Sequence, residues 1–266
     1  MSTSVISSDQ RPDGWSDGAA AYDTWFAPVS SRFAVNALRL LGLEPGQRLL
    51  DVAAGTGALT LQAAAAGVHV VAVDFAPGMV GILRRRLGDA GLRADVEQMD
   101  GQSLGCSSAS FDAACSMFGL IFFPDLDAGA GELRRVVRPG GQVLVAAWDR
   151  GGFPLQEAVE RALQTAVPGL TRPGEPPPAF RVADPDTLGA LLVGAGLRDV
   201  TVLEVSHDWT VRDPAALFRS LPLWAAPMRP VFDRLAPAQI ERAAGAFAAI
   251  MADSLRMTAL FGHGIR

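Results

Sequence analysis

The alternation of short apolar runs with helical patterns constrains the fold of this chain more than any other feature of its sequence. Five runs have the composition of strands: Arg48–Ala53, Val68–Val73, Ala94–Met99, Phe111–Met117 and Gln142–Trp148. Helical patterns lie between them, near Leu59–Ala66, Gly78–Ala90 and Gly129–Val137. The central runs are almost continuously apolar, as strands buried on both faces require. This alternation predicts an α/β fold with a doubly wound parallel sheet, whose ligand site lies at the carboxyl ends of the strands.

The stretch "LLDVAAGTGALTL", Leu49–Leu61, ends the first run in a turn made of small residues. Such a turn lets a ligand lie directly against the backbone. A dinucleotide fingerprint requires a third glycine where Thr60 stands, and Asp51 places a carboxylate close to where a pyrophosphate would lie. A ligand with a cationic group is favoured there instead. S-adenosylmethionine carries an ammonium and a sulfonium and no phosphate, so the turn fits it better than NAD.

The second run continues as "VVAVDFAPGMV", Val70–Val80, in which Asp74 ends the strand. A carboxylate at this position can accept hydrogen bonds from both hydroxyls of a ribose, in a NAD site or in an adenosylmethionine site. Phe75 and Met79 are expected to pack on the adenine. The structural alternative is that Asp74 caps the helix that follows, with Pro77 in its first turn.

Composition makes several other classes of protein poor candidates. The chain has no lysine, so it can hold neither a P-loop nor a Schiff-base lysine. Its formal net charge of -5 at pH 7 gives no general attraction to nucleic acid or to an anionic membrane. Cys106 and Cys115 are its 2 cysteines, and their spacing supports neither a disulfide framework nor a metal site. With no secretory signal and no long apolar run, a reducing cytoplasm is the expected compartment.

Five motifs, taken in order, resemble the class I S-adenosylmethionine-dependent methyltransferases, especially the group similar to ubiquinone and menaquinone methyltransferases. They lie within Tyr22–Asp149 and read "LLDVAAGTGALTL", "VVAVDFAPGMV", "VEQMDGQSL", "FDAACSMFGLIFFPD" and "RRVVRPGGQVLVAAW". The resemblance implies a Rossmann-like seven-stranded sheet, mostly parallel with an antiparallel edge hairpin. It also implies S-adenosyl-L-methionine as the cofactor, with S-adenosyl-L-homocysteine as its product.

The same resemblance assigns roles to residues at the ends of the strands. Around the methionine half of the cofactor it places Asp51, Ala53, Gly55 and Gly57, and on the ribose it places Asp74. Asp100 and Gly101 border the adenine. The residues expected to face the methionine moiety and the transferring methyl group are Ser116, Met117 and Phe118. Two departures stand out: the family has glycine where Ala53 stands, and its "LPF" becomes Leu104-Gly105-Cys106.

The chain divides into four expected parts that form one domain. Residues 1–13 are expected to be a flexible tail, 14–42 the helices of a lid, and 43–150 the cofactor-binding core. In the lid, Tyr22 is the only tyrosine of the chain and is a candidate for contact with cofactor or substrate; the alternative is that it packs under the lid. Residues 151–266 complete the sheet with strands near 198–211 and 256–265, and a helical cap spans about 213–255.

The cap carries the residues expected to bind the substrate. Its large side chains are spaced too irregularly for one helical stripe, so some are expected to face a cavity. Together with a residue of the preceding strand, the candidates are Trp209, Phe218, Trp224, Met228 and Phe232. The alternative is that the cap packs as ordinary core.

Methyl transfer depends mainly on alignment, because the sulfonium is already activated. A base is needed only for a weakly acidic acceptor. Tyr22, His207 and His263 are weak catalytic candidates, and no base is assigned. The leading hypothesis is a methyltransferase that acts on the O, N or C atom of a small, largely apolar metabolite, with a role in secondary metabolism. The alternatives are an adenosylmethionine-binding enzyme that catalyses a cyclisation, and an NAD-linked reductase.

Overall fold

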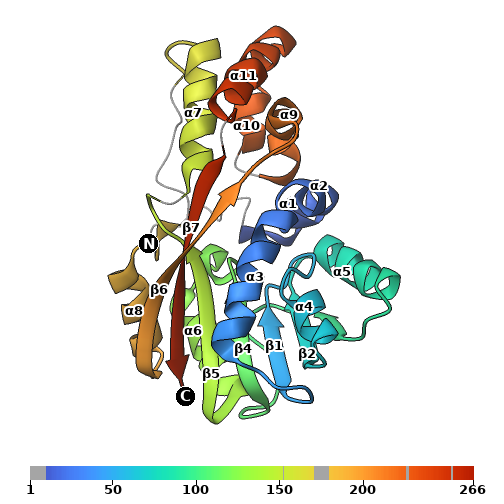
Figure 1. Cartoon of the computed structure of the whole chain (residues 1–266), viewed down its shortest axis with the longest axis vertical. Coiled ribbons are helices and arrows are strands. Elements are labelled where there is room, and N and C mark those ends of the chain that lie inside the picture. The colour runs from blue at the N-terminus through green and yellow to red at the C-terminus, as the bar shows by residue number, and fades with distance from the viewer. Residues whose placement is uncertain (1–9, 152, 171–179, 226–227, 253) are drawn as a thin grey trace, which may run out of the picture.

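The computed structural model describes residues 10–151, 153–170, 180–225, 228–252 and 254–266. Its centre is a seven-stranded sheet with the strand order β3-β2-β1-β4-β5-β7-β6 (Figure 1). The strands are β1 (Arg48–Val52), β2 (His69–Asp74), β3 (Asp95–Gln98), β4 (Phe111–Met117), β5 (Val137–Trp148), β6 (Arg198–Trp209) and β7 (Leu255–Ile265). Only β7 runs against its neighbours, β5 and β6. The expected α/β fold with a mostly parallel sheet is therefore confirmed.

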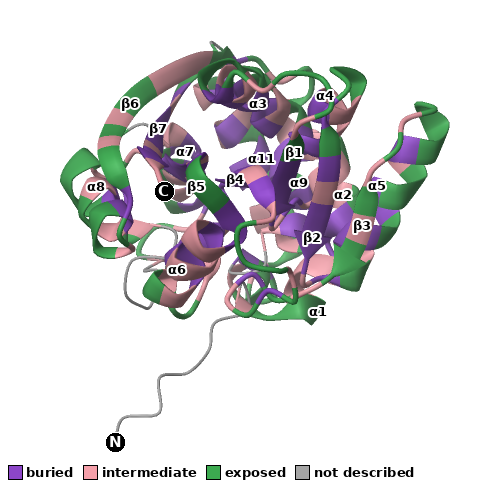
Figure 2. Cartoon of the chain, turned by 90° about the horizontal axis from the view of Figure 1, so that it is seen from below, coloured by how far each residue is buried: buried purple, intermediate pink, exposed green. Residues whose placement is uncertain are grey.

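Helices cover both faces of the sheet. They are α1 (Pro12–Ser16), α2 (Ala19–Trp25), α3 (Ala27–Leu41), α4 (Thr60–Ala65), α5 (Pro77–Asp89), α6 (Leu126–Val136) and α8 (Pro185–Gly194). Seen along the sheet, α3 and α4 lie on one side, and α6 and α8 lie on the other (Figure 2). The buried residues concentrate in the inner strands of the sheet, whereas the edge strands β3 and β6 are mostly exposed or half-buried.

Helix α3 shows how the local sequence fixes one of these layers. Val29, Phe33 and Ala37 recur at every fourth position and are buried, so one face of the helix packs on the sheet. The helix ends at Gly42, whose φ of 53° is the left-handed conformation that closes many helices. The helix lies within the region 14–42, where the helices of a lid were expected.

Beyond one end of the sheet, a group of helices forms the cap (Figure 1). It consists of α7 (Pro154–Ala166), α9 (Pro214–Trp224), α10 (Arg229–Phe232) and α11 (Pro237–Ile250). The expected helical stretch over 213–255 is thus divided into three helices. Pro230 and Pro237 lie in the first turns of α10 and α11, where a proline starts a helix but could not continue one.

Two boundaries differ from the sequence-based expectation. Of the tail predicted for 1–13, residues 1–9 lie outside the described residues, and α1 already begins at Pro12. Strand β5 begins at Val137 instead of Gln142, because Val137 pairs with Phe111 before the register shifts.

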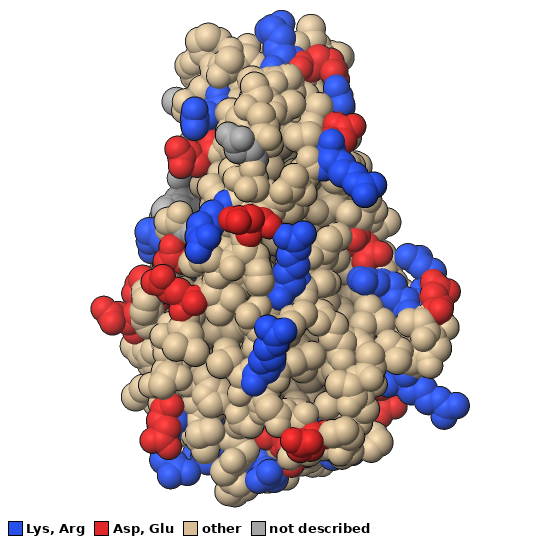
Figure 3. All heavy atoms as spheres, in the orientation of Figure 1, with Lys and Arg blue, Asp and Glu red and all other residues tan. Residues whose placement is uncertain are grey.

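The face shown in Figure 3 carries arginines and acidic residues interspersed, without a large area of one sign. None of the helices in the described part of the chain is long and apolar enough to cross a membrane.

Candidate functional site

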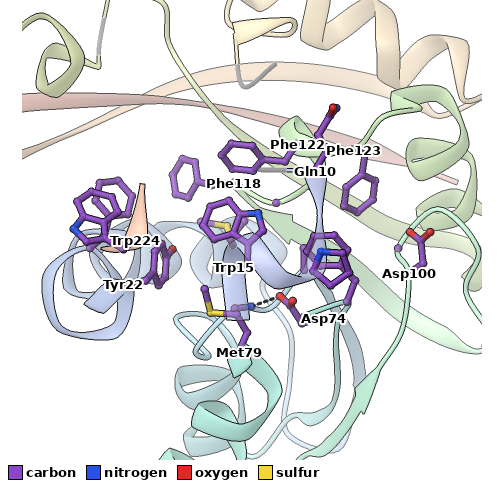
Figure 4. A pocket seen from close by; sticks show the side chains of 18 of the residues that line it. Gln10, Trp15, Tyr22, Asp74, Met79, Asp100, Phe118, Phe122, Phe123 and Trp224 are labelled. Atoms are coloured by element: carbon purple, nitrogen blue, oxygen red, sulfur yellow. Dashed lines mark hydrogen bonds between the residues drawn. The ribbon is translucent and has the colours of Figure 1, made fainter. Parts of the chain in front are cut away.

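A cavity of about 640 Å³ opens at the carboxyl ends of the five parallel strands β1 to β5. This is the side of a doubly wound sheet where ligands bind, next to the point where the strand order reverses between β1 and β4. Each strand contributes a lining residue at its end or just after it: Ala53, Asp74, Gln98, Met117 and Trp148. In the close view, Asp74 and Asp100 lie on one side of the cavity, Tyr22 and Trp224 on the opposite side, and Trp15 between them (Figure 4).

The turn after β1 has an unusual backbone. Ala53 has a φ of 55° and Gly55 a φ of 57°, and alanine adopts this left-handed conformation only at a cost. The family has glycine at position 53. The side chain of Ala53 fits here because the residue next to it in space, Gly119 after β4, has no side chain. A Cβ at Gly119 would lie 2.2 Å from the Cβ of Ala53. Strained backbone of this kind is concentrated at ligand sites.

Asp74 ties the second strand to this turn. Its carboxylate accepts hydrogen bonds from the backbone N–H of Gly55 (2.8 Å) and of Ala76 (2.9 Å). Burial raises the pKa of Asp74 to about 6, although these two hydrogen bonds lower it. The N-cap of α5 is Ala76, so Asp74 does not cap that helix with its side chain. Each carboxylate oxygen keeps a free lone pair, which suits a ligand that offers two hydroxyls.

Asp51 lies beneath the same turn and is buried. One carboxylate oxygen accepts a hydrogen bond from the Thr60 hydroxyl (2.6 Å), and the other, Oδ1, has no partner in the protein. Burial and the neighbouring Asp74 charge raise the pKa of Asp51 to about 7, against the effect of Thr60. A buried carboxylate with an unpartnered oxygen favours a nearby cation or hydrogen-bond donor. These features fit the positively charged methionine end of S-adenosylmethionine.

The structure brings most of the expected cofactor residues together in the cavity wall. They are Tyr22, Ala53, Gly55, Asp74, Phe75, Met79, Asp100, Gly101, Met117 and Phe118. We call Ala53, Gly55, Asp74, Asp100 and Gly101 the loop half of the cavity.

Three expected cofactor residues do not line the cavity. Asp51 and Gly57 support the turn from behind. Ser116 is buried, and its hydroxyl accepts a hydrogen bond from the Leu120 N–H (2.9 Å). Ser116 therefore shapes the chain after β4, and the sequence-based expectation that it faces the ligand is corrected.

Two of the three catalytic candidates also lie away from the cavity wall. His207 bonds to the Asn36 side chain (2.8 Å), and His263 bonds to the Gln142 side chain (2.9 Å). Burial lowers the pKa of both histidines, which favours their neutral forms within the fold. Tyr22 lines the cavity, and its hydroxyl shares a hydrogen bond with Ser30 (3.3 Å). Because desolvation raises its pKa, Tyr22 is a poor base.

Of the residues expected to bind the substrate, only Trp224 lines the cavity. Phe218 is fully buried and packs against Phe232 and Phe247 inside the cap. Trp209 lies one layer behind the wall, with its ring 6.0 Å from that of Phe26. Met228 is buried outside the wall as well. The irregular spacing of these side chains therefore reflects packing between helices more than contact with a cavity.

Several aromatic residues line the cavity beside the expected Trp224, although the sequence did not single them out. Phe26, Trp148, Phe153, Phe180 and Trp224 form what we call the aromatic box. Within it, the ring centroids of Phe26 and Trp224 are 5.2 Å apart, and those of Trp148 and Phe153 are 5.0 Å apart. Trp148 also stacks on Phe118 at 3.9 Å, so the box adjoins the loop half directly.

Charged groups are few in this cavity. Among the lining residues that the structure describes, Asp74 and Asp100 are the only acidic residues, and none is arginine or histidine. Asp100 accepts a hydrogen bond from the Gln102 N–H (2.9 Å). No group of three His, Cys, Asp or Glu side chains in the described ranges is placed to hold a metal ion. The site thus offers two carboxylates next to a largely aromatic space.

Comparisons with known proteins agree with this geometry. A family model described as a methyltransferase domain matches residues 49–141. A demethylmenaquinone methyltransferase from Renibacterium salmoninarum is 32% identical over 219 residues, which cover 74% of this chain and 90% of that protein. An uncharacterized protein from Mycobacterium tuberculosis is 39% identical over 112 residues, which cover 42% of this chain and 41% of that protein. The chain therefore matches about two fifths of the length of this mycobacterial relative.

A solved structure shares the fold. It is phosphoethanolamine N-methyltransferase 2 from Haemonchus contortus in complex with S-adenosyl-L-methionine, with a TM-score of 0.60 and 18% identity over 100% of this chain and 61% of that chain. Together, the sheet, the turn after β1 and the extended match to the Renibacterium protein define a class I methyltransferase. The chain belongs to the S-adenosylmethionine-dependent methyltransferases, a family whose cofactor is S-adenosylmethionine.

Proposed function

We propose that this protein transfers a methyl group from S-adenosylmethionine to a small, largely apolar acceptor. One observation carries the proposal: the loop half and the aromatic box share a single cavity of about 640 Å³. That volume lies within the range of small-molecule sites. The loop half has the polar groups that a nucleoside and an amino acid require, and the box offers space for an apolar molecule beside them.

The cofactor-binding roles follow from the contacts of the loop half. Asp74 is oriented by the N–H groups of Gly55 and Ala76, so its remaining lone pairs can accept the ribose hydroxyls. Phe75 and Met79 offer apolar surface for the adenine, and Asp100 and Gly101 border it. The buried carboxylate of Asp51 lies beneath the turn and favours the positively charged methionine end of the cofactor above it. Ala53, Gly55, Met117 and Phe118 surround the methionine moiety, with Gly57 supporting the turn.

When bound, S-adenosylmethionine supplies a methyl group on a positively charged sulfur that is already activated for transfer. The remaining task for the protein is to hold the acceptor in line and to exclude water. The aromatic box does both, because its rings pack against one another and against Phe118. An apolar box of this kind supports a ring-bearing metabolite as acceptor and a role in natural-product biosynthesis. The free thiols of Cys106 and Cys115 support a reducing cytoplasm.

Two experiments test this function. Calorimetric titration with S-adenosylhomocysteine should show binding, and titration with NAD should show none. Incubation with S-adenosylmethionine carrying an isotopically labelled methyl group and a panel of apolar small molecules should give a labelled product. If the cofactor binds but a product forms without the label, the non-methylating alternative is correct. If S-adenosylhomocysteine does not bind the folded protein, the proposal fails.

A further inference from the structure

The aromatic box surrounds the space that remains for the acceptor. Its rings meet at angles that close the wall: Phe26 and Trp148 are 5.8 Å apart at 71°, and Phe153 and Phe180 are 6.2 Å apart at 62°. Trp224 is held by a hydrogen bond from its Nε1 to Ser220 (2.9 Å). Rings fixed at such angles to one another bring aromatic surface from several elements to the edge of one space.

The described wall of the cavity has no group suited to remove a proton from the acceptor. Its carboxylates belong to the loop half, and it includes neither histidine nor arginine. Tyr22 stays protonated at neutral pH, because desolvation raises its pKa above the usual value. Gln156, the polar side chain beside the box, donates its amide hydrogen to Glu160 (3.0 Å). An oxygen or carbon acceptor that must first lose a proton therefore finds no base here.

The charge of the cavity further restricts the chemical class of acceptor that it can bind. An anionic acceptor would meet two carboxylates and no compensating cation among the described lining residues. A phenolate or enolate would also lack a positively charged partner in the box. A neutral amine needs neither a base nor a cation, since its nitrogen lone pair is already nucleophilic.

We propose that the acceptor is an amine carried by an apolar molecule, and that the aromatic box stabilises the ammonium ion that methylation creates. This inference rests on the proposed methyl transfer. The nitrogen lone pair forms the new bond to the methyl carbon, and the carbon–sulfur bond breaks with its electron pair going to sulfur. Nitrogen therefore gains the positive charge that sulfur loses, and an ammonium ion is attracted to the faces of aromatic rings.

A matched pair of probes tests the box without any turnover. Phenethyltrimethylammonium and its neutral isostere, 3,3-dimethylbutylbenzene, have nearly the same shape and differ in charge. Each is titrated by calorimetry into the full chain saturated with S-adenosylhomocysteine. The ammonium probe should bind about fivefold more tightly or better, which is the scale of one cation–π contact. Equal or tighter binding of the neutral probe, or no binding of either probe, overturns the proposal.

Variants of Phe153 identify the cause of the preference. Phe153→Leu keeps apolar volume but removes the ring, and should reduce the affinity of the ammonium probe about fivefold while leaving that of the neutral probe unchanged. Phe153→Tyr keeps the ring and should retain the preference. Equal loss of both probes in Phe153→Leu would contradict a role of the ring. Binding of S-adenosylhomocysteine is measured on the same samples, so failure of the cofactor site is separated from failure of the box.

Activity on amines gives a second readout. Since the described wall offers no base, an alkylammonium ion must lose its proton to water before it reacts. The pH profile of kcat/KM should therefore rise toward the pKa of the amine and move by about 2 units between two amines whose pKa values differ by about 2 units. A profile that keeps one fixed pKa for both amines would reveal a base in the protein and would overturn this assignment.

Discussion

The loop half and the aromatic box occupy one cavity but are built in different ways. In the loop half, backbone conformation sets the positions: Ala53 and Gly55 have positive φ angles, and Asp74 is held by two N–H groups. In the box, side chains set the positions, and they come from segments as far apart as Phe26 and Trp224. Under the proposed function, cofactor recognition is therefore local to strand ends, whereas acceptor recognition depends on how the cap and the N-terminal helices pack.

The largest expected effect concerns a cap residue outside the cavity. Phe218→Ala should lower the free energy of unfolding by about 3 to 5 kcal/mol, because it empties the fully buried space between Phe232 and Phe247. Chemical denaturation measures this loss, and Val193→Ala, at a residue with 60% exposure, is the matched control with a change of less than about 0.5 kcal/mol. The folded variant should keep its affinity for S-adenosylhomocysteine. A stability change as small as the control's would place Phe218 outside the core of the cap.

The second effect concerns the loop half. Asp74→Ala should weaken the binding of S-adenosylmethionine by about 1.5 to 3 kcal/mol, the range for hydrogen bonds that involve a charged group. The variant also leaves the N–H groups of Gly55 and Ala76 without their acceptor. Asp89→Ala, at the exposed end of α5, is the control and should bind normally. Unchanged affinity in folded Asp74→Ala, measured by calorimetry, would restrict Asp74 to supporting the turn.

The third effect is a gain in stability at the strained turn. Ala53→Gly should raise the free energy of unfolding by about 0.5 to 1 kcal/mol, because relief of the left-handed alanine exceeds the entropy cost of a new glycine. Ala63→Gly inside α4 should instead lower it by about 1 kcal/mol. Urea denaturation of both variants compares them directly. A loss of stability in Ala53→Gly would mean that the contact between its methyl group and Gly119 outweighs the strain.

The last effect is a dependence on pH. Burial raises the pKa of Asp51 to about 7 and that of Asp74 to about 6, so the folded protein holds protons that the unfolded chain has released above about pH 4. Stability from these two groups is therefore present at low pH and is lost as pH rises toward 7. His207 and His263 act in the opposite direction, because their pKa values are lowered.

A matched variant separates these contributions. Asp51→Asn removes one raised pKa and leaves the histidines in place, so it should gain stability relative to the wild type as pH rises from 5 to 8. Denaturation at several pH values measures the difference between the two proteins. A difference that stays constant with pH would show that Asp51 keeps an ordinary pKa in the fold.

The turn after β1 and Asp74 could be predicted because they have fixed places after strands, whereas Asp100 and Gly101 were expected only from the family resemblance. Asp74 ends β2, and Gly55 follows β1, so periodicity alone brings them to one edge of the sheet. The side on which a residue faces was harder to predict. In the almost wholly apolar strand β4, nothing in the spacing shows that Ser116 bonds to Leu120 while Met117 faces the cavity.

Apart from Trp224, the aromatic box could not be predicted, since no local pattern relates its members. Phe153 and Phe180 lie in connections between elements, and Trp148 ends an apolar strand in which it reads as core. Phe218 and Phe232 show the opposite error: their irregular spacing predicted that they face a cavity, but they pack inside the cap. Their partner in the structure is Phe247 on a later helix, and a single sequence does not show which helices pack together.

The positions of the tryptophan side chains make the intrinsic fluorescence of this protein sensitive to ligand binding. Of its 5 tryptophans, Trp15, Trp148 and Trp224 line the cavity. Indole emission responds to the polarity of its surroundings and to stacking partners, so a ligand that fills the cavity should change the emission of these three rings. Trp148, stacked on Phe118 at 3.9 Å, lies where the loop half meets the aromatic box. Intrinsic fluorescence should therefore follow the arrival of cofactor and of acceptor as separate changes in one unlabelled molecule.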